Sequence, residues 1–332
     1  MHFNRAIPPS GVRHVPPLAT LAKRLTRANR WTLRLAVPAL AVILAPPAIA
    51  ARRVVSVRAT SIAYNQGASY DPRLGSFFFA GVTSLDNSGL FRTDSRLRRT
   101  ASRYAAIPAN PQRFNHIGDL SFDSTRRRLL VPLECYYPLR GGNTCRRAAI
   151  GVADPRTLGL RYRVLLDAAQ IAKASWAECS PDGRWIWTSA GTHLLAYRAG
   201  EVSVVTAARQ RAGTAPGLVG RDLGPVLPTS GITGAAVQAT SRFGGYRLLL
   251  SLNRGALFQL VSYDVTTTPD GSPAIAGTAP RVEVSVRRST LNHEPEGLAV
   301  TAKRAGVYPL GAPLHWQMLP ASPVHIRVLS YS

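Results

Sequence analysis

A short phrase that recurs along the chain constrains its fold more than any other feature. Its first copy, residues 117–123 (IGDLSFD), is followed by a basic turn and the apolar run 129–131. The second copy, residues 176–182, begins 59 positions later (117 to 176) and leads into the apolar run 185–187. A weaker third copy opens at Pro295. Each copy reads as a strand, a tight turn and a second strand, and an acidic residue stands at the start of its first strand.

Recurrence at a fixed period is typical of a stacked or radial array of one repeated unit. The rest of the chain is also rich in candidate strands of five to eight residues, separated by Gly, Pro, Asn and Asp. The best helical candidate, residues 167–173, is only about two turns long, and we expect it to be a connector. The sequence therefore predicts an all-β fold, a β-propeller whose innermost strands face one central channel.

The predicted strands group into five blades, and six shorter blades of about 47 residues each are the alternative. The last blade contains only three strands of its own. We expect residues 53–59 to supply its fourth strand, which would close the ring and remove the open sheet edges. The third blade is expected to end in a strand at 202–206. The five groups span 67–107, 118–166, 176–206, 234–286 and 297–329.

The first fifty residues are predicted to be a targeting segment. Residues 1–34 contain seven basic and no acidic residues, and an apolar run follows at 35–45. Two prolines and an A-x-A cleavage pattern at 48–50 complete the features of a secretory signal peptide. Because the apolar run is short for a bilayer span of about 20 residues, an N-terminal membrane anchor is the second interpretation. Both predict that the propeller domain, residues 51–332, is extracytoplasmic, either secreted or anchored at the membrane.

The exported part is strongly basic, with 34 Lys and Arg residues against 17 Asp and Glu once residues 1–50 are removed. One interpretation is a binder of anionic cell-surface polymers. The simpler one is an arginine-rich composition, because the arginines are scattered through predicted turns, where solvated charge is ordinary. No motif for sequence-specific nucleic-acid binding is present, and we expect a monomer.

The cysteines agree with an oxidising compartment. Cys135 and Cys145 are ten positions apart around Gly141-Gly142, which predicts a disulfide that closes a hairpin loop. A loop of this length would contribute about 2–3 kcal/mol to stability on the chain-entropy model. Cys179 is left over, and its neighbours Trp176 and Trp185 predict a buried, inert thiol.

Three acids stand at the start of predicted inner strands: Asp119, Glu178 and Glu296. If all three face the channel, their charges repel and raise one another's pKa unless a cation lies between them. A divalent cation such as Ca²⁺, which takes oxygen ligands, would then be the cofactor. Alternatively, one carboxyl would work as a general acid or base. A further alternative is that these acids cap turns or pair with arginines.

Two histidines occupy matching places in the repeats. His116 and His293 each follow an asparagine and stand three residues before the acid. We predict that they lie near the channel mouth as a catalytic base or as metal ligands. The alternative is that each Asn-His pair shapes its loop by hydrogen bonding to the backbone. The second acids of the repeats, Asp123 and Asp182, are expected to stabilise turns.

The phrases at 179–184 (CSPDGR) and 296–300 (EGLAV) resemble extracytoplasmic propellers of the gluconolactonase/regucalcin, strictosidine-synthase and NHL-repeat type. This resemblance implies that the acid before Gly-Leu-Ala lines the channel and binds a divalent cation. Glu296 is the best match to that acid, and Glu178 is the second. The full ligand set of the lactonases is not evident, because the corresponding positions of the first and fourth blades hold Gly67 and Val237.

Three hypotheses about function follow. The first is an exported propeller that binds a small molecule or an extracellular protein at its channel mouth, with a divalent cation as a structural element. The second is a metal-dependent hydrolase of the lactonase or phosphoesterase type, with Asp119, Glu178 and Glu296 as ligands and His116 or His293 as the base. The third is a basic binder of anionic cell-surface polymers.

Overall fold

The computed structural model describes residues 54–61, 63–84, 86–137, 142–229, 231–240, 245–254, 257–287, 293–301, 306–313 and 326–331. In the strands at 54–60, 306–313 and 326–331, it describes the backbone only. The predicted targeting segment 1–50 and a strand predicted at 314–319 lie outside the described residues. Within the described ranges, no helix is long and apolar enough to span a bilayer.

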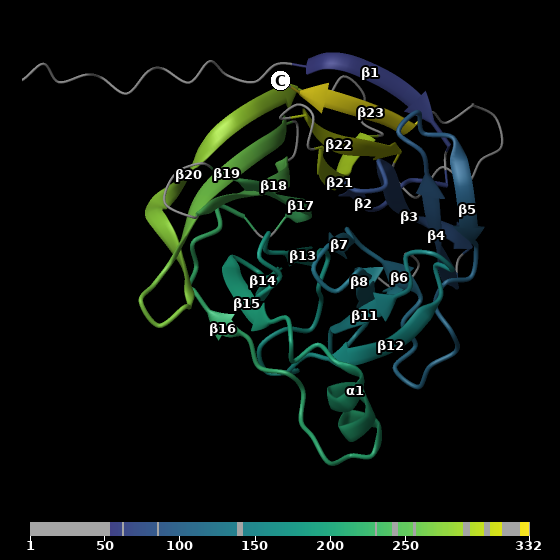
Figure 1. The fold of residues 1–332 in the computed structure, drawn as a ribbon, viewed down its shortest axis with the longest axis vertical. Coiled ribbons are helices and arrows are strands. Elements are labelled where there is room, and N and C mark those ends of the chain that lie inside the picture. The colour runs from purple at the N-terminus through teal and green to yellow at the C-terminus, as the bar shows by residue number, and fades with distance from the viewer. Residues whose placement is uncertain are drawn as a thin grey trace, which may run out of the picture. The chain divides into compact units, whose positions relative to one another are not determined.

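Antiparallel sheets surround one axis in the manner of propeller blades (Figure 1). The predicted fold class, an all-β propeller, is thereby confirmed. Among the described residues, four sheets are regular and four-stranded. The first contains β2 (Ala68–Asp71), β3 (Ser76–Ser84), β4 (Asn87–Thr93) and β5 (Arg99–Arg103). Two others contain β13 (Glu178–Cys179), β14 (Trp185–Ala190), β15 (His193–Arg198) and β16 (Arg221–Asp222), and then β17 (Ile232–Ala239), β18 (Tyr246–Arg254), β19 (Leu257–Thr267) and β20 (Pro273–Arg287).

The remaining regular sheet joins the two ends of the domain. It contains β21 (His293–Thr301), β22 (Gly306–Pro313), β23 (Ile326–Tyr331) and β1 (Val54–Thr60). The pairing of β1 with β23 is antiparallel and includes Val57 opposite Leu329. The prediction that a strand at 53–59 completes the last blade is confirmed.

One sheet is irregular because its innermost strand is divided. β6 (His116–Ile117) and β7 (Ser121–Asp123) both pair with β8 (Arg128–Glu134), which continues to β11 (Ala149–Ala153) and β12 (Leu160–Leu165). Between β6 and β7 the chain bridges to the next blade instead. There Asp119 N–H donates to the Ser175 carbonyl at 2.9 Å, and Ala177 N–H donates to the Asp119 carbonyl at 3.1 Å. This detour places Asp119 at the axis.

The predicted outer strand of the third blade is wrong. Residues 204–206 instead form the start of α1 (Val204–Arg211), and the outer strand is β16, farther along the chain. Ser203 caps the helix by accepting a hydrogen bond from Thr206 N–H, and Arg209 and Arg211 lie in its last turn, where cations are favourable. The β-branched run Val-Val-Thr favours a strand, but the Ser203 cap and the helix-forming residues after this run stabilise a helix instead. The predicted helical connector at 167–173 is also wrong, because this segment forms turns.

Apolar clusters fill the spaces between neighbouring sheets. Phe78 and Val131 pack in the cluster between the first and second sheets, and Trp187 packs with Leu248 between the third and fourth. These side chains are fully buried, as is Trp176 beside the axis. The inner strands therefore pack against a filled apolar core, which fixes the position of the side chains at the axis.

Candidate functional site

Asp119 lies where the inner strands of the other sheets meet. Its Oδ1 accepts a hydrogen bond from the backbone N–H of Ala68 at 2.8 Å. Its Oδ2 accepts from the N–H groups of Ala235 at 2.8 Å and Leu298 at 3.3 Å. These donors belong to β2, β17 and β21, while the backbone of Asp119 bridges to Trp176 beside β13. One buried residue thus connects its own sheet to four others.

Glycines allow the inner strands to approach this closely. A Cβ atom on Gly118 would lie 2.0 Å from the carbonyl oxygen of Ser175, and one on Gly297 would lie 2.6 Å from the backbone nitrogen of Ala68. Both distances are too short for any larger residue. The repeated glycine therefore serves close packing at the axis, and at the level of Asp119 the strand backbones are in contact.

Glu178 is the second acid at the axis. It is buried, and it accepts hydrogen bonds from the Ser121 hydroxyl and the Val237 backbone N–H. Burial raises the pKa of Glu178 well above its ordinary value, and these hydrogen bonds offset only part of the increase. Burial also raises the pKa of Asp119, its three N–H donors oppose this, and the nearby charge of Glu178 adds to the increase. At least part of the predicted convergence of acids on the axis is therefore present.

Glu296 is buried at the same axis, but its place in the repeat differs from the predicted one. Gly297 makes the close approach that Gly118 makes in the second copy, and Leu298 N–H reaches the carboxylate of Asp119. Leu298, rather than Glu296, is therefore the counterpart of Asp119. In the same region β21 pairs irregularly with β22, with a register shift between residues 295 and 298.

The cation site predicted at Asp119, Glu178 and Glu296 stays a prediction. The described part of the chain contains no group of three or more His, Cys, Asp or Glu residues that could hold a metal ion. A cation at Asp119 would also have to compete with the three backbone N–H donors of its carboxylate.

His116 forms a buried hydrogen bond with an acid at the start of the inner strand. Its Nδ1 lies 3.0 Å from Oε2 of Glu134, which stands opposite it on β8. The half-exposed Lys173 lies on the other side, with its Nζ 3.7 Å from Oε1 of Glu134. Burial raises the pKa of Glu134, but the hydrogen bond with His116 and the charge of Lys173 outweigh it, so the pKa lies below its ordinary value. Glu134 is therefore an ionised carboxylate, and it orients the imidazole of His116.

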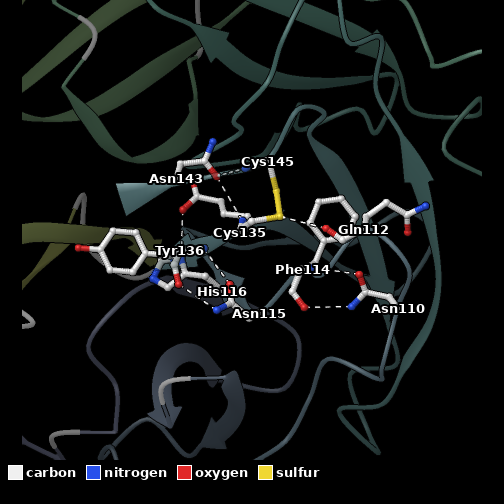
Figure 2. Close-up of a disulfide and its surroundings, with 10 residues drawn as sticks. Asn110, Gln112, Phe114, Asn115, His116, Cys135, Tyr136, Asn143 and Cys145 are labelled. Atoms are coloured by element: carbon white, nitrogen blue, oxygen red, sulfur yellow. Dashed lines mark hydrogen bonds and ion pairs between the residues drawn. A yellow bond between two sulfur atoms is a disulfide. The ribbon is translucent and has the colours of Figure 1, made fainter. Parts of the chain in front are cut away.

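The neighbours of His116 hold it in place (Figure 2). Asn115 donates from Nδ2 to the Tyr136 carbonyl at 2.9 Å, and its Oδ1 accepts from Tyr136 N–H at 2.8 Å. The Tyr136 ring lies against the imidazole, with the ring centres 5.2 Å apart. The asparagine of this Asn-His pair therefore shapes the loop, as the alternative interpretation predicted, while the histidine pairs with an acid.

Other predicted residues have mixed outcomes. The backbone of His293 begins β21, but its side chain lies outside the described residues, so its role stays a prediction.

The disulfide between Cys135 and Cys145 is confirmed. Cys179 is a buried free thiol, as predicted, and burial raises its pKa well above the ordinary value. The turn acids are confirmed, since Asp123 Oδ1 accepts the N–H groups of residues 125 and 126.

The sequence pattern did not single out Lys173 or Tyr136 as neighbours of this site. Lys173 lies in the connection from β12 to β13, and only the fold brings it to Glu134. Tyr136 follows Cys135, so the predicted disulfide hairpin was the signal that could have placed it beside the site.

No protein-family model and no curated protein matches this chain. Among solved structures, it is similar to a GH43 endo-arabinanase from Bacillus licheniformis, at 10% identity over 82% of this chain and 95% of that chain, with a TM-score of 0.47. It is similar to the native arabinanase Arb43A of Bacillus subtilis, at 10% identity over 82% and 96%, with a TM-score of 0.46. A third similar structure is the Cps50 (Swd1) β-propeller domain of Myceliophteria thermophila, at 10% identity over 85% and 99%, with a TM-score of 0.37. The arrangement of the sheets confirms the propeller part of the resemblance, while the gluconolactonase, strictosidine-synthase and NHL-repeat relationship stays a prediction.

Proposed function

We propose that this chain is an exported β-propeller that binds a ligand or partner at the channel mouth where the inner strands begin. The observation that carries the proposal is the buried hydrogen bond between His116 and Glu134 at the start of β6. Burial of an ionised carboxylate costs desolvation free energy, so on stability grounds alone two apolar residues would serve this position as well. The inner strands are in close contact at Asp119, so in this proposal a bound group lies beyond that level, at the mouth.

Export rests on two observations of different kinds. The sequence of residues 1–50 has the features of a secretory signal, and the Cys135–Cys145 disulfide fits an oxidising compartment. In this proposal the propeller acts outside the cytoplasm, on a small molecule or an extracellular protein.

The same hydrogen bond supports a hydrolase as the second candidate. An acid that orients a histidine through Nδ1 is the usual partner of a histidine acting as general base. In a metal-dependent lactonase or phosphoesterase, Glu134 would be the positioning residue and His116 the base. The Ca²⁺ or other divalent cation of that candidate is tested directly below.

The experiment is a set of thermal melts of the exported chain with CaCl₂, with EDTA, and with a panel of lactones and phosphate esters. We expect at least one compound to raise the melting temperature of the wild type and to have a smaller effect on His116→Gln. The matched control is His193→Gln, because His193 forms a similar pair with Asp222 on the third blade but is exposed. Turnover of the stabilising compound would favour the hydrolase, and a shift with CaCl₂ that EDTA reverses would favour a cation.

Equal shifts in both histidine variants would contradict binding at this mouth. Stabilisation only by polyanions, lost as salt is raised, would favour the basic polymer binder instead.

A further inference from the structure

A cavity of about 330 Å³ lies between β12, α1 and the loop 108–112, away from the channel mouth. Arginines and glutamines provide its polar lining. Arg161 and Arg163 come from β12, Gln210 and Arg211 come from α1, and Gln112 comes from the loop. Its volume falls within the range of small-molecule sites, which is roughly 300–1,000 Å³.

Positive charge in this cavity is not balanced by protein carboxylates. Arg161 is paired with Asp154, but no described carboxylate forms an ion pair with Arg163 or Arg211. Arg163 Nη2 instead donates to Oε1 of Gln112 at 2.8 Å. Burial lowers the pKa of Arg163, and the charge of Arg211 lowers it further. Two guanidinium groups thus repel each other at one cavity, and a bound anion would relieve that repulsion.

The walls of the cavity are held in place from two sides. Gln210 fastens α1 to the edge of β12, because its Oε1 accepts from Leu165 N–H at 2.7 Å and its Nε2 donates to the Leu165 carbonyl at 2.9 Å. On the loop, Asn110 Oδ1 accepts from Phe114 N–H at 2.8 Å, and Asn110 Nδ2 donates to the Phe114 carbonyl at 3.0 Å. The strand, helix and loop that carry the lining residues therefore form a fixed frame, which holds the arginines at the cavity.

The disulfide extends this frame. Figure 2 shows Gln112 beside the disulfide, with its carbonyl oxygen 3.3 Å from Cys135 Sγ. The same residue therefore contacts the disulfide through its backbone and Arg163 through its side chain. Groups that are positioned before binding lose less entropy when a ligand arrives.

We propose that this cavity binds a small organic anion, whose carboxylate or phosphate group lies between Arg163 and Arg211. Guanidinium groups match the planar, two-oxygen edge of such anions and form strong charge-assisted hydrogen bonds with them. The apolar part of the ligand would contact Leu160 and Pro111, which also line the cavity. This site is independent of the proposed function at the mouth.

The test is calorimetric titration of the exported chain with phenyl phosphate, benzoate and inorganic phosphate at constant ionic strength. Phenyl phosphate and benzoate carry an apolar ring, so we expect at least one of them to bind more tightly than inorganic phosphate. Arg163→Gln and Arg211→Gln are each expected to weaken that binding about tenfold. The matched control is Arg209→Gln, on the same helix but outside the cavity lining, which should change binding less than about twofold.

A second measurement uses melting temperature and keeps the test valid if a variant is less stable. Without an anion, Arg211→Gln should melt at or above the temperature of Arg209→Gln, because both variants lose a favourable charge in the last turn of α1 but only Arg211→Gln also removes a repulsion. With phenyl phosphate or benzoate, the wild type should gain stability and Arg211→Gln should not. Absence of binding in the wild type at millimolar anion, or an equal loss in Arg209→Gln, would overturn the proposal.

Discussion

The carboxylate of Asp119 is the point at which the inner strands of the propeller are joined. Carboxylates at a channel axis are usually considered as ligands or acids, but this one accepts backbone N–H groups from three other sheets. Buried N–H groups need acceptors, and the inner strands have none at this level from a neighbouring strand. Asp119 is therefore the acceptor that allows the sheets to meet at the axis.

Replacement of Asp119 by alanine should strongly destabilise the protein. Three buried N–H groups would lose their acceptor, and each unsatisfied group costs about 1–3 kcal/mol. We expect the free energy of unfolding to fall by at least about 3 kcal/mol in urea denaturation. Asp182→Ala, which removes an exposed turn acid, is the control and should cost less than about 2 kcal/mol. Similar losses in the two variants would mean that the axis bonds contribute little.

Glu178 should make the stability of the protein depend on pH. Its pKa is raised well above 4.5 by burial, so the folded state holds the proton more tightly than the unfolded chain does. The free energy of unfolding should then fall as pH rises from about 4.5 through the folded-state pKa. In Glu178→Gln, which mimics the protonated form, this fall should be smaller. Urea denaturation between about pH 4 and 8 measures it, with exposed Glu201→Gln as the control; parallel profiles in all three proteins would contradict the assignment.

At the scale of elements, the alternation of apolar residues was enough to predict most strands. The strand predicted at 193–198 is β15, with the same bounds, and the strand predicted at 129–133 is β8, which extends one residue farther at each end. The errors occur where tertiary contacts decide the outcome. β6 and β7 are divided because Asp119 bridges to the neighbouring sheet, and nothing local in the sequence signals that bridge. Residues 204–206 favour a strand by composition, but Ser203 caps a helix.

The candidate site was predictable to a similar degree. The repeat indicated Asp119 and Glu178 as neighbours at the axis, because equivalent positions of a propeller meet there. It could not show that their partners are backbone N–H groups, since these come from residues that carry no chemical signal of their own. Glu134 was harder to identify as the partner of His116, because the two residues meet only through the register between β6 and β8, which the sequence pattern does not give.

At the scale of the whole molecule, the ring is closed by a strand from the start of the domain. β1 forms the outer strand of the last sheet and gives that sheet its fourth strand. The closure also leaves β23 paired on both sides, with β22 and with β1. An unpaired β23 would offer its backbone groups to another chain.

A proline in β1 should therefore open the ring. Arg58→Pro places a rigid residue without a backbone N–H in the ladder, opposite Val328. We expect a lower melting temperature and the appearance of oligomers in light scattering, because the edge of β23 becomes available. Ala168→Pro, in an exposed turn, is the control and should leave both properties close to those of the wild type. A monomeric Arg58→Pro variant with wild-type melting would show that the closure is dispensable.

The pairing of Val57 with Leu329 has a further consequence, which concerns time. These two residues are 272 positions apart (57 to 329), and contacts between such distant segments form slowly because a large loop must close first. During synthesis, the first strand emerges long before its partner. Until residue 326 has emerged, the first strand has no partner to pair with, and a chaperone has that interval in which to bind it.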